Sequence, residues 1–407
     1  MTAEASTISE TTEKIQAALR DYIEATYHVG HPTLIAQRRA LLEQEGVLFR
    51  APFIESTPRY QGGRRFADLD LDGPVLELFQ SLAAPAGKLK PVLYDPPYTH
   101  QAEALEWTTR DGMSLAITTG TGSGKTESFL LPMLAKLVRE AAQAPESFQV
   151  PAVRALILYP MNALVNDQLG RLRMLLGDPR VTTRFQASAG RPPRFARYTS
   201  RTFYPGVRSR KKDQLRLKPI EEFYIMLLDQ AGDESSPGHD SAVALIDMLR
   251  ARGKWPAKPD LQAWYGAKNA RWQNAAGDFL RAITLPEDPE LLTRHEVLQA
   301  PPDVLITNYS MLEYMLMRPL ERPVFDMTRL WLEANPDEKF LLIIDEAHLY
   351  RGAAGAEVAL LLRRLRSRLG IPPDRLQVIA TSASFASPEY ARVFAAQLSG
   401  KDVADFR

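Results

Sequence analysis

One glycine-rich segment of the sequence has residue types and spacing that suit phosphate binding. Residues 118–126 read Thr-Thr-Gly-Thr-Gly-Ser-Gly-Lys-Thr. Glycines let the backbone turn tightly and direct successive N–H groups at phosphate oxygens. Lys125 would reach the β- and γ-phosphates, and the Thr126 hydroxyl would bind Mg²⁺. The segment therefore predicts an ATP site with Mg²⁺ as cofactor, and its predicted ATP-binding residues are Thr121, Gly122, Ser123, Gly124, Lys125 and Thr126.

A flexible glycine linker is the alternative interpretation of this segment. A linker would explain the glycines, but not the Lys-Thr pair or the flanking sequence. The apolar run 115–117 precedes the loop, and residues 127–140 carry apolar side chains at helical spacing. A strand, a loop and a helix in this order favour the phosphate loop, because the helix dipole attracts anions to its N-terminus.

Two carboxylates, Asp345 and Glu346, follow the apolar run 340–344 directly. In open α/β sheets, ligands collect at the carboxyl ends of strands. Asp345 is predicted to hold Mg²⁺, and Glu346 to orient and deprotonate the attacking water. Together with Lys125, they form the predicted catalytic set.

Gln101 lies in a predicted helix shortly before the phosphate loop. A glutamine amide can pair with an adenine edge, since it is donor and acceptor at once. Alternatively, Gln101 is a solvated helix residue. Its position before the loop favours adenine binding.

The elements that position these residues alternate between apolar runs and helical segments. Further runs at 154–159, 303–307 and 376–380 are typical of strands buried in a parallel sheet. Strand, loop and helix thus repeat along the chain. This pattern predicts an α/β fold with a parallel sheet and helices on both faces.

The stretch 180–218 is strongly basic and contains aromatic residues. Asp213 is its only acid, against twelve Lys and Arg residues. Such a stretch suits a nucleic-acid backbone, with Arg197 and Arg201 as candidate contacts. The alternative is an ordinary solvated face.

A mainly helical insertion is predicted after this stretch, and it contains Trp255, Trp264 and Trp272. The tryptophans could stack on the bases of a single strand. The favoured alternative is that they form the insertion's own small core.

Composition narrows the class of protein. The net charge of +1 gives no global basic bias, so a nucleic-acid surface must be local. The absence of cysteine excludes disulfides and cysteine-ligated zinc. No apolar run approaches the roughly 18–20 residues that span a bilayer. These features predict a soluble cytoplasmic protein without a membrane partner.

The ordered motifs resemble superfamily 2 DEAD/DEAH-box helicases over residues 94–180 and 296–385. The phosphate loop comes first, then Asp-Glu-Ala-His at 345–348, then Thr-Ser-Ala-Ser at 381–384. Thr119 departs from the usual glycine, and Ser384 from the usual threonine. The resemblance implies a RecA-like P-loop NTPase domain in which His348, Ser382 and Ser384 couple the ATP state to strand movement.

Segments that resemble helicase motifs Ia and Ib begin near Asn162 and Asn308. In that family both motifs contact the nucleic-acid backbone, and Gln101 resembles the Q motif. The implied partner is nucleic acid, with DNA favoured over RNA. More narrowly, residues 159–164, 291–296 and 307–314 are similar to large bacterial helicases of phage-defence systems such as Druantia.

We predict four regions. Residues 1–85 form an N-terminal, largely helical accessory region, and residues 86–180 the first part of the RecA-like domain. The basic and Trp-rich insertion covers 181–295, and the second part of the domain covers 296–407.

Superfamily 2 motors hydrolyse ATP between two RecA-like domains, and the second supplies arginines to the transferring phosphate. No Gln-x-x-Gly-Arg-x-x-Arg segment occurs in this sequence. We therefore expect the second domain in a longer chain or a partner subunit, and a poorly active ATPase without it. An ATP-binding regulatory module without motor activity is the alternative. Another kind of P-loop enzyme, such as a kinase, is disfavoured because it leaves the other helicase-like segments unexplained.

Overall fold

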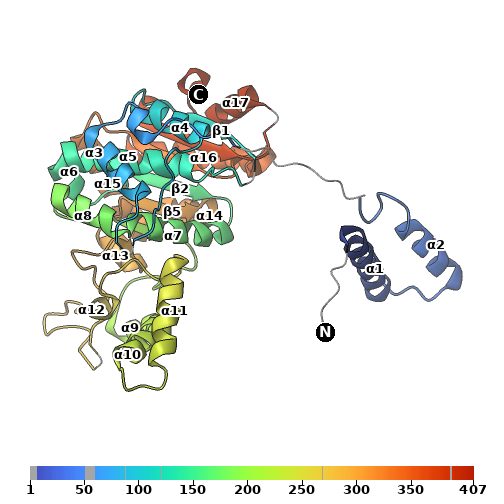
Figure 1. Cartoon of the computed structure of the whole chain (residues 1–407), viewed down its shortest axis with the longest axis horizontal. Helices are drawn as coiled ribbons and strands as arrows, with labels where there is room; N and C mark the ends of the chain where they lie inside the picture. The colour runs from blue at the N-terminus through green and yellow to red at the C-terminus, as the bar shows by residue number, and fades with distance from the viewer. Residues whose placement is uncertain (1–6, 51–59, 88, 121, 268, 386) are drawn as a thin grey trace. The chain divides into compact units, whose positions relative to one another are not determined.

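The computed structural model describes residues 7–50, 60–87, 89–120, 122–267, 269–385 and 387–407. The chain divides into two compact units, residues 1–59 and 60–407. The first unit contains α1 (Ile8–Thr26) and α2 (Pro32–Leu42) (Figure 1). Arg20 of α1 pairs at 3.1 Å with Glu43, which directly follows α2. Thr7 caps α1 in a capping box with Glu10.

The second unit is built on a seven-stranded parallel sheet with the order β1-β7-β6-β2-β5-β3-β4. The strand that precedes the phosphate loop, β1, is separated from β6, which precedes the paired carboxylates, by β7 alone. The strands are β1 (Leu115–Thr118), β2 (Ala155–Tyr159), β3 (Phe195–Arg197), β4 (Glu290–Leu291), β5 (Val304–Asn308), β6 (Phe340–Ile344) and β7 (Leu376–Ser382).

Both faces of the sheet are buried because successive side chains of each strand point to opposite faces. In β2, for example, Ile157 belongs to one hydrophobic core, and its neighbours Leu156 and Leu158 belong to the other. The first core contains α3 (Gly73–Ala83), α4 (Thr99–Thr109), α5 (Glu127–Gln143), α6 (Pro145–Gln149), α7 (Asn162–Leu176) and α8 (Pro179–Ala189). The second contains α13 (Arg294–Gln299), α14 (Tyr309–Met317), α15 (Arg322–Ala334), α16 (Gly352–Leu369) and α17 (Pro388–Ser399).

The insertion has a hydrophobic core of its own. Its helices α9 to α12 lie together in Figure 1. Trp255, Trp264 and Trp272 are all buried in it, so the interpretation of the tryptophans as a small core is confirmed. The insertion contains α9 (Arg210–Ile220), α10 (Met226–Gly232), α11 (His239–Ala251) and α12 (Leu261–Tyr265).

The α/β fold with a parallel sheet covered by helices on both faces is confirmed. The four regional boundaries stay a prediction. α3, which precedes the predicted boundary at residue 85, packs within the second unit against α5 and α8. Among the described residues, no helix is both long and apolar enough to span a bilayer.

Candidate nucleotide-binding site

The glycine-rich loop connects β1 to the N-terminus of α5, as predicted. Gly122 and Gly124 have φ of 80° and 74°, a backbone conformation that side chains disfavour. The buried Ser123 hydroxyl donates to Thr119 Oγ1 at 2.7 Å. Thr121 lies outside the described residues. The two left-handed glycines give the loop the tight turns that a cradle of N–H groups requires.

Lys125 of the loop meets Glu346, which follows β6. The distance from Lys125 Nζ to Glu346 Oε1 is 3.3 Å, and their side chains are 12% and 26% exposed. Glu346 has φ of 51°, and strained backbones of this kind cluster at functional sites. Two predicted catalytic residues, 221 positions apart in the chain, therefore lie in direct contact.

Asp345 is a buried carboxylate at the end of β6. Burial raises its pKa, and the charge of Glu346 acts in the same direction, while the hydrogen bond from Thr381 opposes them. Thr381 Oγ1 and the Glu346 backbone N–H both donate to Oδ1. Oδ2 accepts no hydrogen bond from the described residues. It is therefore open to a cation.

The described residues contain no cluster of three or more His, Cys, Asp or Glu side chains that could hold a metal ion. Mg²⁺ is usually bound by one or two carboxylates together with substrate phosphates rather than by an all-protein cage. Asp345 and Thr126 fit that mode.

Ser382, the last residue of β7, contacts both the phosphate loop and the segment that follows β6. The Ser382 hydroxyl and His348 Nδ1 are hydrogen-bonded at 3.0 Å, and His348 Nδ1 lies 3.3 Å from Glu346 Oε2. The Ser382 carbonyl accepts from the Thr119 N–H at 3.2 Å. Ser384 joins only through its backbone, whose N–H donates to Ser382 Oγ. Ser382 thus connects the phosphate loop with His348.

Gln101 is buried rather than solvated, with 6% of its surface exposed. Its Nε2 donates to the Gly124 carbonyl at 2.9 Å, and its Oε1 accepts from the Tyr98 N–H at 2.9 Å. Each amide atom retains one further hydrogen-bonding position. Gln101 therefore touches the phosphate loop directly, and adenine pairing by it stays a prediction.

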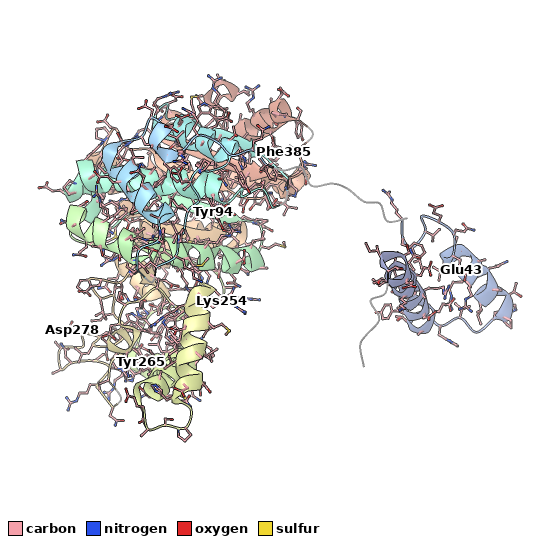
Figure 2. The ribbon with its side chains drawn as sticks, in the orientation of Figure 1. Glu43, Tyr94, Lys254, Tyr265, Asp278 and Phe385 are labelled. Atoms are coloured by element: carbon pink, nitrogen blue, oxygen red, sulfur yellow. The ribbon has the colours of Figure 1, made fainter. Side chains whose placement is uncertain are left out.

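A cavity of about 470 Å³ adjoins Gln101 and the loop glycines Gly122 and Gly124. Its walls are mostly aromatic, aliphatic and proline side chains, which suit a planar base. Figure 2 marks one of its lining residues, Tyr94. The site thus combines a phosphate loop with an adjoining apolar pocket.

Two residues of α7 at this site were not predicted. Arg171 lines the cavity and pairs with Glu127 at 2.8 Å, and Gln168 Nε2 lies 3.4 Å from Thr126 Oγ1. Their spacing of three positions on a helix that follows β2 was the available signal, because it places both on one face.

The four residues predicted to bind nucleic acid form a second cluster, at the carboxyl ends of β2, β3 and β5. Asn308 Nδ2 donates to Asn162 Oδ1 at 2.6 Å. Arg197 Nη2 donates to the Arg201 carbonyl at 3.2 Å. Asn162 Nδ2 lies 3.5 Å from the Oγ of Ser200, which is three positions after the end of β3. Residues from three separate segments are therefore brought together, and their nucleic-acid contact stays a prediction.

Part of the basic stretch 180–218 serves the fold instead. Arg191 forms a two-point ion pair with Asp303, and Arg180 donates to the carbonyls of Ser81, Ala84 and Lys90. The exposed cations of the stretch include Arg201, Arg210, Lys211, Lys212, Arg216 and Lys218.

The sequence is similar to those of known helicases. Residues 98–199 match the DEAD/DEAH box helicase family. The chain is 46% identical over 411 residues to Druantia protein DruE of Escherichia coli, covering 98% of this chain and 22% of that protein. It is 29% identical over 125 residues to an uncharacterized ATP-dependent helicase of Methanocaldococcus jannaschii, covering 31% of this chain and 17% of that protein. The chain therefore spans about a fifth of the length of these relatives.

Solved structures with lower identity also match. The DUF1998 helicase MrfA bound to DNA and AMPPNP is 20% identical, with a TM-score of 0.44, over 93% of this chain and 34% of that chain. The DEAD-box helicase Mss116 bound to ssRNA and UDP-BeF is 12% identical, with a TM-score of 0.41, over 84% of this chain and 45% of that chain.

Proposed function

Because this chain carries a DEAD/DEAH box helicase domain, we propose that it is the ATP-binding first RecA-like domain of a helicase that couples ATP hydrolysis to movement on DNA. The observation that carries the proposal is the contact of Lys125 with Glu346, next to the His348–Ser382 hydrogen bond. The similarity to Druantia protein DruE supports a role in cytoplasmic anti-phage defence.

ATP would bind with its phosphates in the glycine-rich loop and its base in the cavity beside Gln101. The left-handed glycines and the apolar walls support this placement. Lys125 would turn from Glu346 to the phosphates, because a cation partly exposed to water is readily re-paired. This exchange would release Glu346 for catalysis.

Thr126 and the free Oδ2 of Asp345 would hold Mg²⁺, which when bound offsets negative charge on the phosphates. Glu346 would orient the attacking water and accept its proton. A change in the position of Glu346 would shift His348 and, through it, Ser382, since His348 contacts both.

DNA would run along the cluster of Asn162, Arg197, Arg201 and Asn308. The amides and guanidinium groups of these residues suit phosphate oxygens, which carry no sequence information. The cluster shares the carboxyl edge of the sheet with the ATP site, so strand movement and hydrolysis would be coupled over a short path.

The test is the ATPase rate with and without single-stranded DNA, for this chain alone and for a longer version that adds a second RecA-like domain. We expect DNA-stimulated turnover only in the longer version, since the second domain supplies arginines worth orders of magnitude in rate. The variant Glu346→Gln should abolish it. Equal, DNA-indifferent rates in both versions would contradict the motor and leave an ATP-binding regulatory module.

A further inference from the structure

The insertion contains an open groove of about 1180 Å³, lined by α9 and by the segment 269–275. It lies outside the nucleotide site and outside the Asn162–Asn308 cluster, and it shares no lining residue with either. Figure 2 marks Tyr265, one of its lining residues, in this part of the molecule. The proposed motor function does not use this groove.

The charge of the groove is strongly positive. Five cationic side chains and one carboxylate, Glu221, are among its described lining residues. Arg210, Lys211 and Arg271 are exposed and form no ion pair with any described residue. Glu221 accepts a hydrogen bond from the Tyr265 hydroxyl at 2.6 Å. The groove therefore presents several free cations to one anion.

A buried cation, Arg281, strengthens this field. Only 6% of Arg281 is exposed, and no described carboxylate pairs with it. Its Nε donates to the Tyr265 carbonyl at 2.9 Å, and its guanidinium lies 4.1 Å from the centre of the Trp272 ring. A buried charge without a counter-ion is costly and lacks screening by water. Its potential therefore reaches into the groove and favours an anion there.

The groove also offers uncommitted amides. The side chains of Gln214 and Asn269 line it and make no hydrogen bond to the described residues. An amide can pair with base edges as donor and acceptor. Base edges are freely accessible in a single strand, whereas a duplex offers them only within its grooves.

We propose that this groove binds the phosphate backbone of single-stranded nucleic acid, as a second site apart from the Asn162–Asn308 cluster. The free cations would neutralise phosphates, and the amides would contact the bases. This site would hold a strand whether or not ATP is turned over.

The helix α9 supplies a matched pair of variants. Arg210 and Lys211 line the groove, whereas Lys212 and Arg216 are exposed on the same helix but do not line it. Arg210→Gln/Lys211→Gln and Lys212→Gln/Arg216→Gln remove the same charge, and glutamine keeps a similar helix propensity. Circular dichroism would verify that both variants fold.

The measurement is fluorescence anisotropy of a labelled oligothymidine, and of a matched duplex, without nucleotide across a salt series. Each phosphate contact on a single strand contributes a salt slope of about 0.7, so losing two should weaken binding about 25-fold at 0.1 M salt and lower the slope by about 1.4. We expect this loss for the groove variant, and a clearly smaller one for the control.

Equal losses in the two variants would mean that α9 attracts anions without a defined site, and would overturn the proposal. So would unchanged binding in the groove variant, or a loss confined to the duplex. Because the binding experiment contains no ATP, its result does not depend on whether the protein is a motor. Likewise, a failure of the groove proposal would not affect the interpretation of the ATPase test.

Discussion

Charged residues have opposite roles at the two ends of the parallel strands, which we call the amino edge and the carboxyl edge of the sheet. At the amino ends of β2 and β5, Arg154 is fully buried and pairs with Glu140 at 2.7 Å and with Asp303 at 3.0 Å. At the carboxyl end of β6, Lys125 meets Glu346 by one contact of 3.3 Å, and both side chains are partly exposed.

The difference separates ion pairs that stabilise the fold from ion pairs that are available to a ligand. A buried pair must satisfy nearly every hydrogen bond, because water cannot replace a lost partner. A partly exposed pair contributes little to stability and is easily exchanged for another partner. The Arg154 guanidinium accordingly makes a full set of hydrogen bonds, whereas the Lys125–Glu346 pair at the carboxyl edge retains binding capacity.

Among the variants that test this contrast, the largest expected effect is on the ATPase rate. In the longer version with a second RecA-like domain, Lys125→Met should lower this rate by at least about 100-fold, since it removes a preorganised cation for the transferring phosphate. Its free energy of unfolding should change by less than about 1 kcal/mol. Steady-state kinetics and urea unfolding would measure the two quantities. A stability loss as large as that of an Arg154 variant would break the contrast.

At the amino edge we expect a large effect on stability. Arg154→Met should lower the free energy of unfolding by about 3–5 kcal/mol, because Glu140 and Asp303 would both lose a buried partner. Urea unfolding would measure it. Arg322→Met is the control: Arg322 pairs with Asp326 at 3.0 Å but is 64% exposed, so no measurable change is expected. Similar behaviour of the two variants would contradict the stabilising role of the Arg154 ion pairs.

Acid should weaken the amino edge. Burial of Asp303 raises its pKa, but Arg191 and Arg154 outweigh burial and hold the pKa below the ordinary value. With a folded pKa below the unfolded one of about 3.9, Asp303 stabilises the fold above that pH, and this contribution disappears as the pH falls through the folded pKa. The stability difference between the native protein and Asp303→Asn should therefore shrink below about pH 4. Urea unfolding across the pH range would test this, and a difference that grows in acid would refute it.

The smallest expected effect is on the stability of an Asp345 variant, and it is a gain rather than a loss. Its pKa is raised, so its ionisation costs stability once the pH exceeds the unfolded value. Asp345→Asn removes that cost, and its carbonyl oxygen can still accept from Thr381 and from the Glu346 N–H. Without nucleotide or Mg²⁺, the variant should melt at the same or a higher temperature at pH 7, with less gain in acid. A lower melting temperature at pH 7 would show that Asp345 stabilises the fold.

Much of the fold was predictable because its signals are local. The five predicted apolar runs are strands within one or two residues of the predicted bounds, since an apolar run is typical of a parallel strand. The phosphate loop and the 345–348 box carry their chemistry in adjacent residues. β3 and β4 were missed because strands of three and two residues leave no periodic pattern.

The contacts between distant segments of the chain could not be predicted from the sequence. Nothing local indicates that Gln101 reaches the Gly124 carbonyl, or that Asn162 and Asn308 touch, because both depend on tertiary packing. The network of Arg154 was also not predicted. Part of the basic stretch looked like a nucleic-acid surface because sequence composition does not reveal which cations already have partners.

Two segments that flank the helices α9 to α12 of the insertion lie side by side. Phe203 and Thr293 form a parallel backbone bridge, and the Arg294 N–H donates to the Phe203 carbonyl at 3.0 Å. The entropic cost of closing such a loop rises only logarithmically, by about 0.6 kcal/mol for each doubling of its length. The cost of loop closure alone therefore sets little limit on how many residues can lie between Phe203 and β4.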